Sequence, residues 1–129
     1  MAGVSICVAV AGMALAETAG KPVMHSSVFN WSELKVKPTK TGEVRPVFDA
    51  PTPALADLEC HITTPNPGES PPLSHQQPAE ELMIIREGVV AALQGDRTNK
   101  ATAGGTHFKA SNEIHALRNI GTNRRLISR

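Results

Sequence analysis

Two short segments of this chain carry a set of polar side chains that constrains the possible folds more than any other feature. One segment runs from 68 to 88 and the other from 104 to 119. The polar residues in question are His75, Gln77, Glu81 and His115. Imidazole and carboxylate groups are common ligands of divalent transition metals. A fold that brings the two segments together would therefore create a potential metal site.

Turn residues recur along the chain and indicate β-structure. Pro65-Asn66-Pro67-Gly68, Gly95-Asp96 and Gly104-Gly105 separate short runs that are expected to be strands. Turns spaced roughly every 8 to 12 residues are typical of an all-β sandwich or barrel. The predicted strands in this part of the chain cover 58–64, 97–102, 106–110 and 114–120.

Together, the two polar segments resemble the paired motifs of the cupin superfamily, which are small β-barrels that usually hold one metal in the barrel mouth. In the second motif Gly104, His115 and Asn119 match, whereas Ala110 and Asn112 replace the usual Pro and Gly. In the first motif a Gln, at position 77, replaces the second His. Asn at a Gly position is tolerable because Asn accepts left-handed backbone conformations.

The resemblance implies an all-β fold, a cupin-type double-stranded β-helix (jelly-roll) barrel formed by residues 28–129. Only ten residues follow Asn119, and Arg125–Ser128 is a short, polar candidate for the last strand. The barrel is therefore expected to be incomplete at its C-terminal edge, either open there or covered by a second subunit.

Residues 78–95 offer two interpretations. Leu82, Ile85, Val89 and Leu93 fall at helical spacing, which favours an amphipathic helix. The cupin pattern instead requires two strands, 81–86 and 89–93, with a turn at Glu87-Gly88. A glycine in the middle of a helix costs about 1 kcal/mol relative to Ala. We predict the two strands, giving the long-range pattern more weight than the local periodicity.

The resemblance also implies one divalent transition metal, Fe, Mn, Ni or Zn. His75, Glu81 and His115 would be its ligands, and Gln77 would be either a weaker ligand or a hydrogen-bonding neighbour. Asn119 is expected to brace a turn near the metal. Three further histidines match no motif position and are predicted to be surface or structural residues, namely His25, His61 and His107.

Two classes of function follow from these residues. The first is a metal-dependent cupin enzyme of the dioxygenase or isomerase type, which acts on a small polar metabolite. The second is a non-catalytic ligand-binding or sensing barrel, or a degenerate cupin without metal. The missing second histidine and the absence of tyrosine favour the second class, and Glu81 is the main acid/base candidate. Whether the protein is an enzyme stays open at this level.

The N-terminal sixteen residues contain no charged side chain and end in Ala14-Leu15-Ala16, which is typical of a signal-peptidase site. We predict an export signal at 1–16, a flexible leader at 17–27 and a periplasmic or extracellular protein; otherwise it is cytoplasmic. The alternative for this segment is an Ala-rich helix or strand. Removal of Cys7 with the signal would leave Cys60 alone, as a small buried hydrophobe.

Charge and aromatic content narrow the range of partners. The net charge is +1, from 13 basic and 12 acidic residues, and the chain has three Phe, one Trp and no Tyr. Neither a basic patch nor a stacking platform for bases is indicated, so nucleic acid is not an expected partner. The apolar N-terminal run is shorter than the about 20 residues of a membrane-spanning helix, so stable membrane insertion is not expected. A small-molecule ligand and a homodimer formed through an edge strand are the expected partners.

Overall fold

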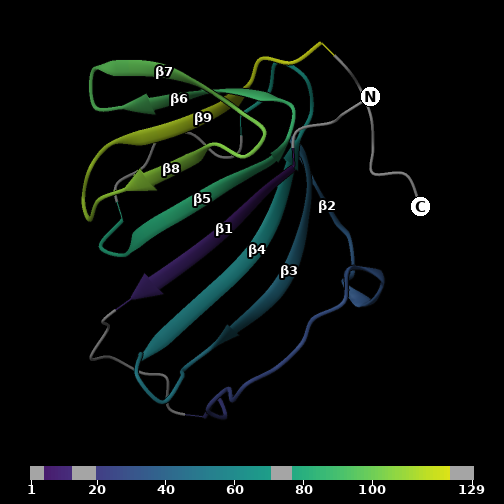
Figure 1. Ribbon diagram of the computed structural model, residues 1–129, viewed down its shortest axis with the longest axis vertical. Helices are drawn as coiled ribbons and strands as arrows, with labels where there is room; N and C mark the ends of the chain where they lie inside the picture. Colours follow the sequence, from purple (N-terminus) through teal and green to yellow (C-terminus); the bar gives the residue numbers. More distant parts are fainter. Residues whose placement is uncertain (1–4, 13–19, 71–76, 123–129) are drawn as a thin grey trace.

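The computed structural model describes residues 5–12, 20–70 and 77–122, and these residues form an all-β protein (Figure 1). Nine strands lie in two antiparallel sheets, and the described residues contain no α-helix, only a short 3-10 helix at Trp31–Glu33. No helix in these ranges is long and apolar enough to cross a membrane.

The larger sheet has six strands in the order β2-β3-β4-β1-β5-β8. Their bounds are Ser5–Gly12 (β1), Lys37–Thr39 (β2), Gly42–Ala50 (β3), Asp57–Pro65 (β4), Glu80–Glu87 (β5) and Thr106–Lys109 (β8). The smaller sheet has the order β7-β6-β9. Its strands are Val89–Gln94 (β6), Arg97–Thr102 (β7) and His115–Asn119 (β9). The all-β prediction is confirmed, but the described strands do not close into a barrel.

The ambiguous segment 78–95 forms strands, as predicted. β5 and β6 are separated by Gly88, whose φ of 80° lies in the left-handed region that favours glycine. Along β5, Glu81, Met83 and Ile85 are buried, and the residues between them are exposed. This alternation has the period of two that a strand requires, and it places Glu81 on the inner face.

The hydrophobic core lies between the two sheets. Its fully or nearly buried members are Ile6, Val8, Met83, Ile85, Val90 and Leu117. They come from β1, β5, β6 and β9, so the core joins residues that are far apart in the sequence. Burial of each such side chain contributes about 1.5–3 kcal/mol relative to exposure.

Strand β1 coincides with the predicted export signal. It pairs with β4 on one side and β5 on the other, and Figure 1 shows it in the interior of the larger sheet. Ile6 and Val8 are 1% and 3% exposed. The described part of the segment is thus a strand, which is the alternative that the sequence left open. A chain cleaved after Ala16 would lose this strand, and the export signal itself stays a prediction.

The same strand brings the two cysteines together. The Sγ atom of Cys7 lies 3.6 Å from that of Cys60 on β4. Cys60 is buried, as predicted, but in the whole chain it is not alone. Burial, followed by the neighbouring Cys7, raises the pKa of the Cys60 thiol to about 12, so this thiol is protonated at neutral pH.

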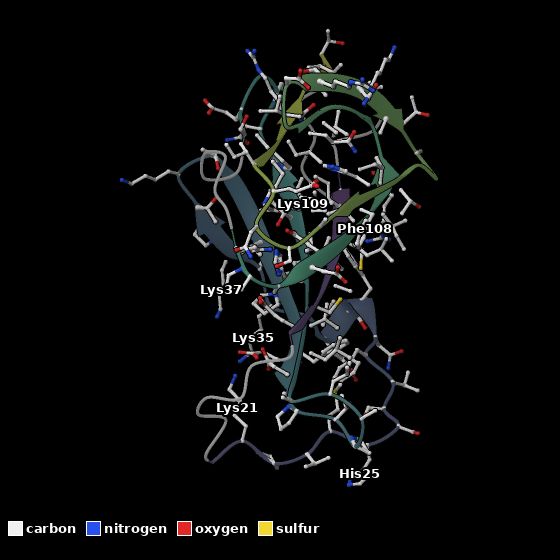
Figure 2. The ribbon with its side chains drawn as sticks, turned by 90° about the vertical axis from the view of Figure 1, so that its left-hand side faces the viewer. Lys21, His25, Lys35, Lys37, Phe108 and Lys109 are labelled. Atoms are coloured by element: carbon white, nitrogen blue, oxygen red, sulfur yellow. The ribbon has the colours of Figure 1, made fainter. Side chains whose placement is uncertain are left out.

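Residues 20–36 contact both faces of the larger sheet: Asp49, the partner of Lys21, lies opposite Glu59 on the face that carries His61, whereas Arg86 lies on the other face. Lys21 forms an ion pair of 2.7 Å with Asp49, and the ring of Trp31 lies against the guanidinium groups of Arg45 and Arg86 at 4.6 and 4.5 Å. Figure 2 shows Lys21 and His25 toward the lower end of the molecule, away from Lys109.

Candidate functional site: a polar cluster at one end of an apolar cavity

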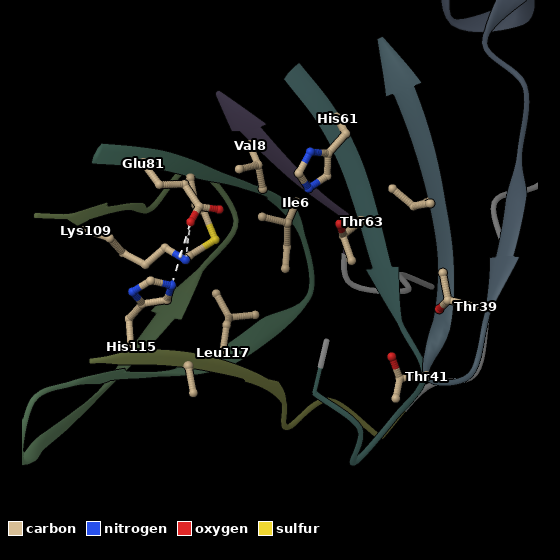
Figure 3. A pocket seen from close by; sticks show the side chains of 13 residues that line it. Ile6, Val8, Thr39, Thr41, His61, Thr63, Glu81, Lys109, His115 and Leu117 are labelled. Carbon is tan, nitrogen blue, oxygen red and sulfur yellow. Dashed lines mark ion pairs between the residues drawn. The ribbon is translucent and has the colours of Figure 1, made fainter. Parts of the chain in front are cut away.

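A cavity of about 320 Å³ lies on the inner face of the larger sheet. Its walls are mostly apolar and include Ile6, Val8, Met83 and Leu117. Figure 3 shows Glu81, Lys109 and His115 together at one end, with Thr39 and Thr41 at the other. Cavities of this size and apolar character are typical of small-molecule sites.

Strand register determines the composition of the polar end. Glu81 on β5 lies directly opposite Lys109 on the edge strand β8. Alternation along β8 turns His107 and Lys109 inward and leaves Thr106 and Phe108 exposed. His115 is the first residue of β9, with Leu117 and Asn119 buried on the same face. Three strands therefore bring a carboxylate, an ammonium group and imidazoles into one region.

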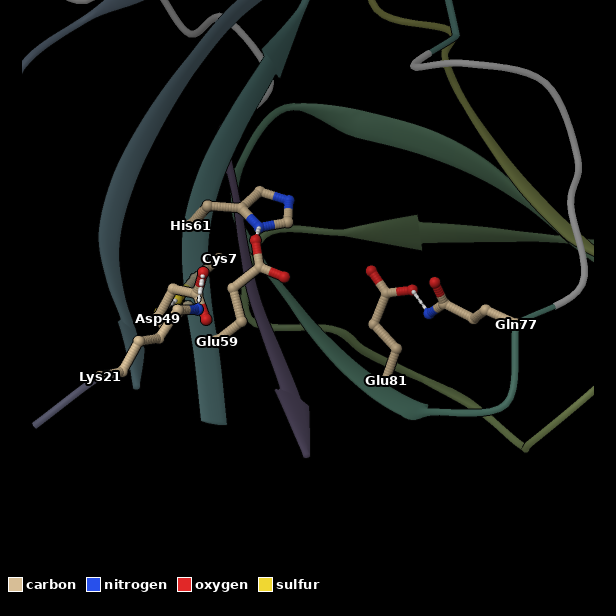
Figure 4. A network of polar contacts seen from close by, with 8 residues as sticks. Cys7, Lys21, Asp49, Glu59, His61, Gln77 and Glu81 are labelled. Atoms are coloured by element: carbon tan, nitrogen blue, oxygen red, sulfur yellow. Dashed lines mark hydrogen bonds and ion pairs between the residues drawn. The ribbon is translucent and has the colours of Figure 1, made fainter. Parts of the chain in front are cut away.

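One carboxylate oxygen is the centre of this cluster. The Nζ atom of Lys109 forms an ion pair with Oε2 of Glu81. The amide of Gln77 donates a hydrogen bond of 3.0 Å to the same oxygen (Figure 4). Nε2 of His115 lies 3.9 Å from it. The side chains of Glu81, Lys109 and His115 are 9%, 7% and 5% exposed, so the cluster is almost fully removed from solvent.

Hydrogen bonding orients the ring of His115. Nδ1 lies 3.0 Å from the backbone carbonyl oxygen of Glu113. A carbonyl oxygen only accepts, so Nδ1 carries the proton and donates it to this bond. In the neutral imidazole Nε2 is then the acceptor nitrogen, and it faces the Glu81 carboxylate.

Burial shifts the pKa of two basic groups in the cluster. It lowers the pKa of Lys109, although the hydrogen bond and charge of Glu81 oppose this effect. It also lowers the pKa of His107, and the charges of Lys109 and His115 lower it further. His107 is 3% exposed, and within the described residues neither of its ring nitrogens has a hydrogen-bond partner. Both shifts favour the neutral form of the base.

Three of the four predicted metal ligands come together, namely Gln77, Glu81 and His115. The fourth, His75, lies outside the described residues. Within those residues no three His, Cys, Asp or Glu side chains are placed so that they could hold a metal ion. The ammonium group of Lys109 already supplies positive charge to the Glu81 oxygen that a metal would use. The described side chains therefore do not fit a divalent metal while Lys109 occupies this position.

Asn119 braces the chain as predicted. Its side-chain amide donates to the carbonyl oxygen of Pro65 at 2.9 Å, and its Oδ1 accepts from the backbone N–H of Gly121 at the same distance. These bonds connect the end of β9 to the end of β4. Asn119 is 1% exposed, so these hydrogen bonds link the two sheets through a buried side chain.

Sequence reasoning missed the two basic residues Lys109 and His61 of the cavity lining. Lys109 had no assigned role, although the alternation in 106–109 would have placed it on the same face as His107. His61, predicted to be a surface or structural residue, lines the cavity, and its Nδ1 lies 3.1 Å from Oε1 of Glu59 (Figure 4). His25 is exposed and His107 is buried, which agrees with the roles predicted for them.

Comparisons with protein-family models, with curated proteins and with solved structures gave no match to this chain.

Proposed function

We propose that this protein is a small-molecule-binding β-protein of the cupin type that holds a neutral ligand in its cavity without a metal. The ligand would have an apolar body and one hydrogen-bonding end group, such as a hydroxyl, an amide or a carbonyl. The observation that carries the proposal is the gathering of Glu81, Lys109 and His115 at one end of a mostly apolar cavity.

The charge of the polar end favours a neutral ligand. Glu81 and Lys109 neutralise each other in a region that is almost free of solvent. A charged ligand would add a buried charge without a partner, which is costly, whereas a neutral end group needs only hydrogen bonds. The ammonium group has three N–H donors and the ion pair uses one of them, so donors are available to a ligand oxygen.

Apolar burial supplies most of the affinity in this proposal. Val8, Met83 and Leu117 line the wall beside the polar cluster, and contact with them would remove a ligand's apolar surface from water. The cupin-type arrangement is supported by the two antiparallel sheets and by the motif positions of Glu81, His115 and Asn119. The ion pair that Glu81, the main acid/base candidate, forms with Lys109 supports a binding role.

Four probes that share a cyclohexyl body test the proposal: cyclohexylmethanol, cyclohexanecarboxamide, cyclohexanecarboxylate and methylcyclohexane. Two-dimensional 1H–15N spectra of the full chain would be recorded with each. We expect the alcohol and the amide to shift the signals of Thr63, Leu117 and Lys109 at lower concentration than the other two. A tighter interaction with the carboxylate, or no shift with any probe, would overturn it.

A matched variant separates the contribution of the polar end to binding from that of the apolar wall. Lys109→Met keeps a long apolar side chain and removes the donor. It should abolish the preference for the alcohol and the amide over methylcyclohexane while leaving the weaker apolar binding in place. Lys100→Met, on an exposed position of β7, is the control and should change neither.

A further inference from the structure

We propose that Lys109 captures aldehydes covalently, as a protonated imine inside the cavity. This inference rests on the proposed function, because it assumes that the cavity admits a small organic molecule. It goes further by naming the carbonyl compound as the ligand class and the lysine nitrogen as the atom that bonds to it.

Lys109 differs from every other lysine of the chain in its surroundings. The other five are exposed, at positions 21, 35, 37, 40 and 100. Lys109 is 7% exposed, and its side chain forms part of the wall of the cavity. A carbonyl compound held against Val8 and Leu117 would present its polar end to the Lys109 nitrogen. A lysine that is desolvated in an apolar pocket is the usual setting for imine formation.

Glu81 supplies the proton transfers that the reaction requires. The Lys109 ammonium first gives a proton to Glu81, and the neutral nitrogen attacks the carbonyl carbon. The carbonyl oxygen takes this proton back from Glu81 and becomes the hydroxyl group of a carbinolamine. The nitrogen then gives a second proton to Glu81, and the hydroxyl takes that proton and leaves as water as the nitrogen forms a double bond to carbon. In sum, one ammonium and one aldehyde give one protonated imine and one water.

The product retains the charge balance of the site. A protonated imine at Lys109 is still a cation next to the Glu81 carboxylate, so capture leaves no buried charge without a partner. The apolar walls exclude water, which would otherwise hydrolyse the imine. His115 presents Nε2 toward this carboxylate, 3.9 Å from Oε2 of Glu81.

Reductive trapping tests the proposal on the full chain. The protein would be incubated with cyclohexanecarboxaldehyde and sodium cyanoborohydride, digested, and mapped by mass spectrometry. We expect the alkylated Lys109 peptide to exceed the mean of the exposed lysines by roughly tenfold, because binding raises the local concentration of the aldehyde. Labelling of Lys109 at or below the level of the exposed lysines would overturn the proposal.

Two controls separate this inference from the proposed function. Lys109→Arg keeps a cation opposite Glu81 but cannot form an imine, and it should lose the preferential labelling. Cyclohexylmethanol cannot react, and it should compete with the aldehyde and lower the labelling of Lys109 alone. If the alcohol binds in the cavity and Lys109 is not trapped, imine formation is wrong and the binding function stands. If neither compound enters the cavity, both are wrong.

Discussion

Lys109 lies directly across the β5–β8 ladder from Glu81, and their side chains form a buried ion pair at the end of the cavity. The pair is set by strand register, because residues directly opposite each other in an antiparallel ladder turn their side chains to the same face. The two residues therefore depend on each other, since either of them alone would be a buried charge without its partner.

Loss of the cation should destabilise the protein more than loss of both charges. Lys109→Met leaves Glu81 buried and unpaired, and we expect the free energy of unfolding to fall by roughly 3 kcal/mol. The double variant Lys109→Met/Glu81→Gln should recover most of this loss, because neither charge is left. Urea unfolding of the wild type, both single variants and the double variant measures the coupling. Additive effects would show that the pair does not interact energetically.

The metal content of the protein tests whether the Glu81 carboxylate binds the Lys109 ammonium group or a metal ion. We expect well under one equivalent of Fe, Mn, Ni or Zn in protein purified without a histidine tag, because Lys109 is bound to the carboxylate oxygen. Elemental analysis by mass spectrometry of the wild type beside His115→Ala makes the measurement. One metal per chain in the wild type, lost in the variant, would contradict our interpretation of the site and support the metal site that the sequence predicts.

Burial of His107 should make stability depend on pH. The pKa of His107 is lowered in the folded protein, by burial and by Lys109 and His115, with Glu81 opposing. The unfolded chain therefore takes up the proton first as the pH falls through its ordinary value of 6.5. The free energy of unfolding should decrease in this range by at most about 1.4 kcal/mol per pH unit for this one group.

A non-titrating variant isolates this contribution. His107→Gln should flatten the dependence of the unfolding free energy on pH between about pH 7.5 and 5.5, since only the wild type gains the proton on unfolding. His25→Gln, which removes an imidazole from an exposed position, is the control. Equal slopes in the wild type and His107→Gln would mean that His107 is not held neutral by the fold.

Strand positions were more predictable from the sequence than the contents of the site. The long-range motif correctly predicted β5 and β6, although the local spacing of Leu82, Ile85 and Val89 is helical, and Gly88 between the strands adopts a positive φ that suits a turn. The motif positions also brought Glu81 and His115 together. Lys109 was missed because its importance depends on the register between two strands about 25 residues apart, a long-range feature that no local pattern encodes.

The role of the N-terminal segment could not be read from composition. An apolar run ending in Ala-Leu-Ala suits an export signal, and an apolar run also suits a strand that is covered on both faces. Strand pairing is what distinguishes a buried strand from an export signal. Ser5–Gly12 pairs with β4 and β5, and both lie far along the chain. The prediction that Cys60 lacks a cysteine partner rested on the same interpretation, because it assumed that Cys7 is removed with the export signal.

Gly42 offers a test of the β2–β3 turn, which holds Thr39 and Thr41 at the far end of the cavity. Its φ is +152°, and a Cβ there would collide with the backbone carbonyl oxygen of Thr64. Gly42→Ala should cost roughly 1–3 kcal/mol of unfolding free energy. Gly95→Ala is the matched control, because Gly95 has a φ of +59° and open space around the added carbon. It should cost only about 1 kcal/mol. A smaller loss at Gly42 than at Gly95 would contradict the close approach.

Retention of strand β1 is the last prediction, and it concerns the mature protein. Ile6 and Val8 belong to the core and also line the cavity, so the folded state depends on residues 5–12. We expect Ile6→Ala to lower the free energy of unfolding by roughly 2–4 kcal/mol. We also expect the intact mass of the folded protein to include this segment. Ala9→Gly, at a less buried position of the same strand, is the control and should cost less. A folded, stable protein whose mass corresponds to a chain starting at Glu17 would show that another segment fills the space between β4 and β5. Such a result would support the predicted export signal.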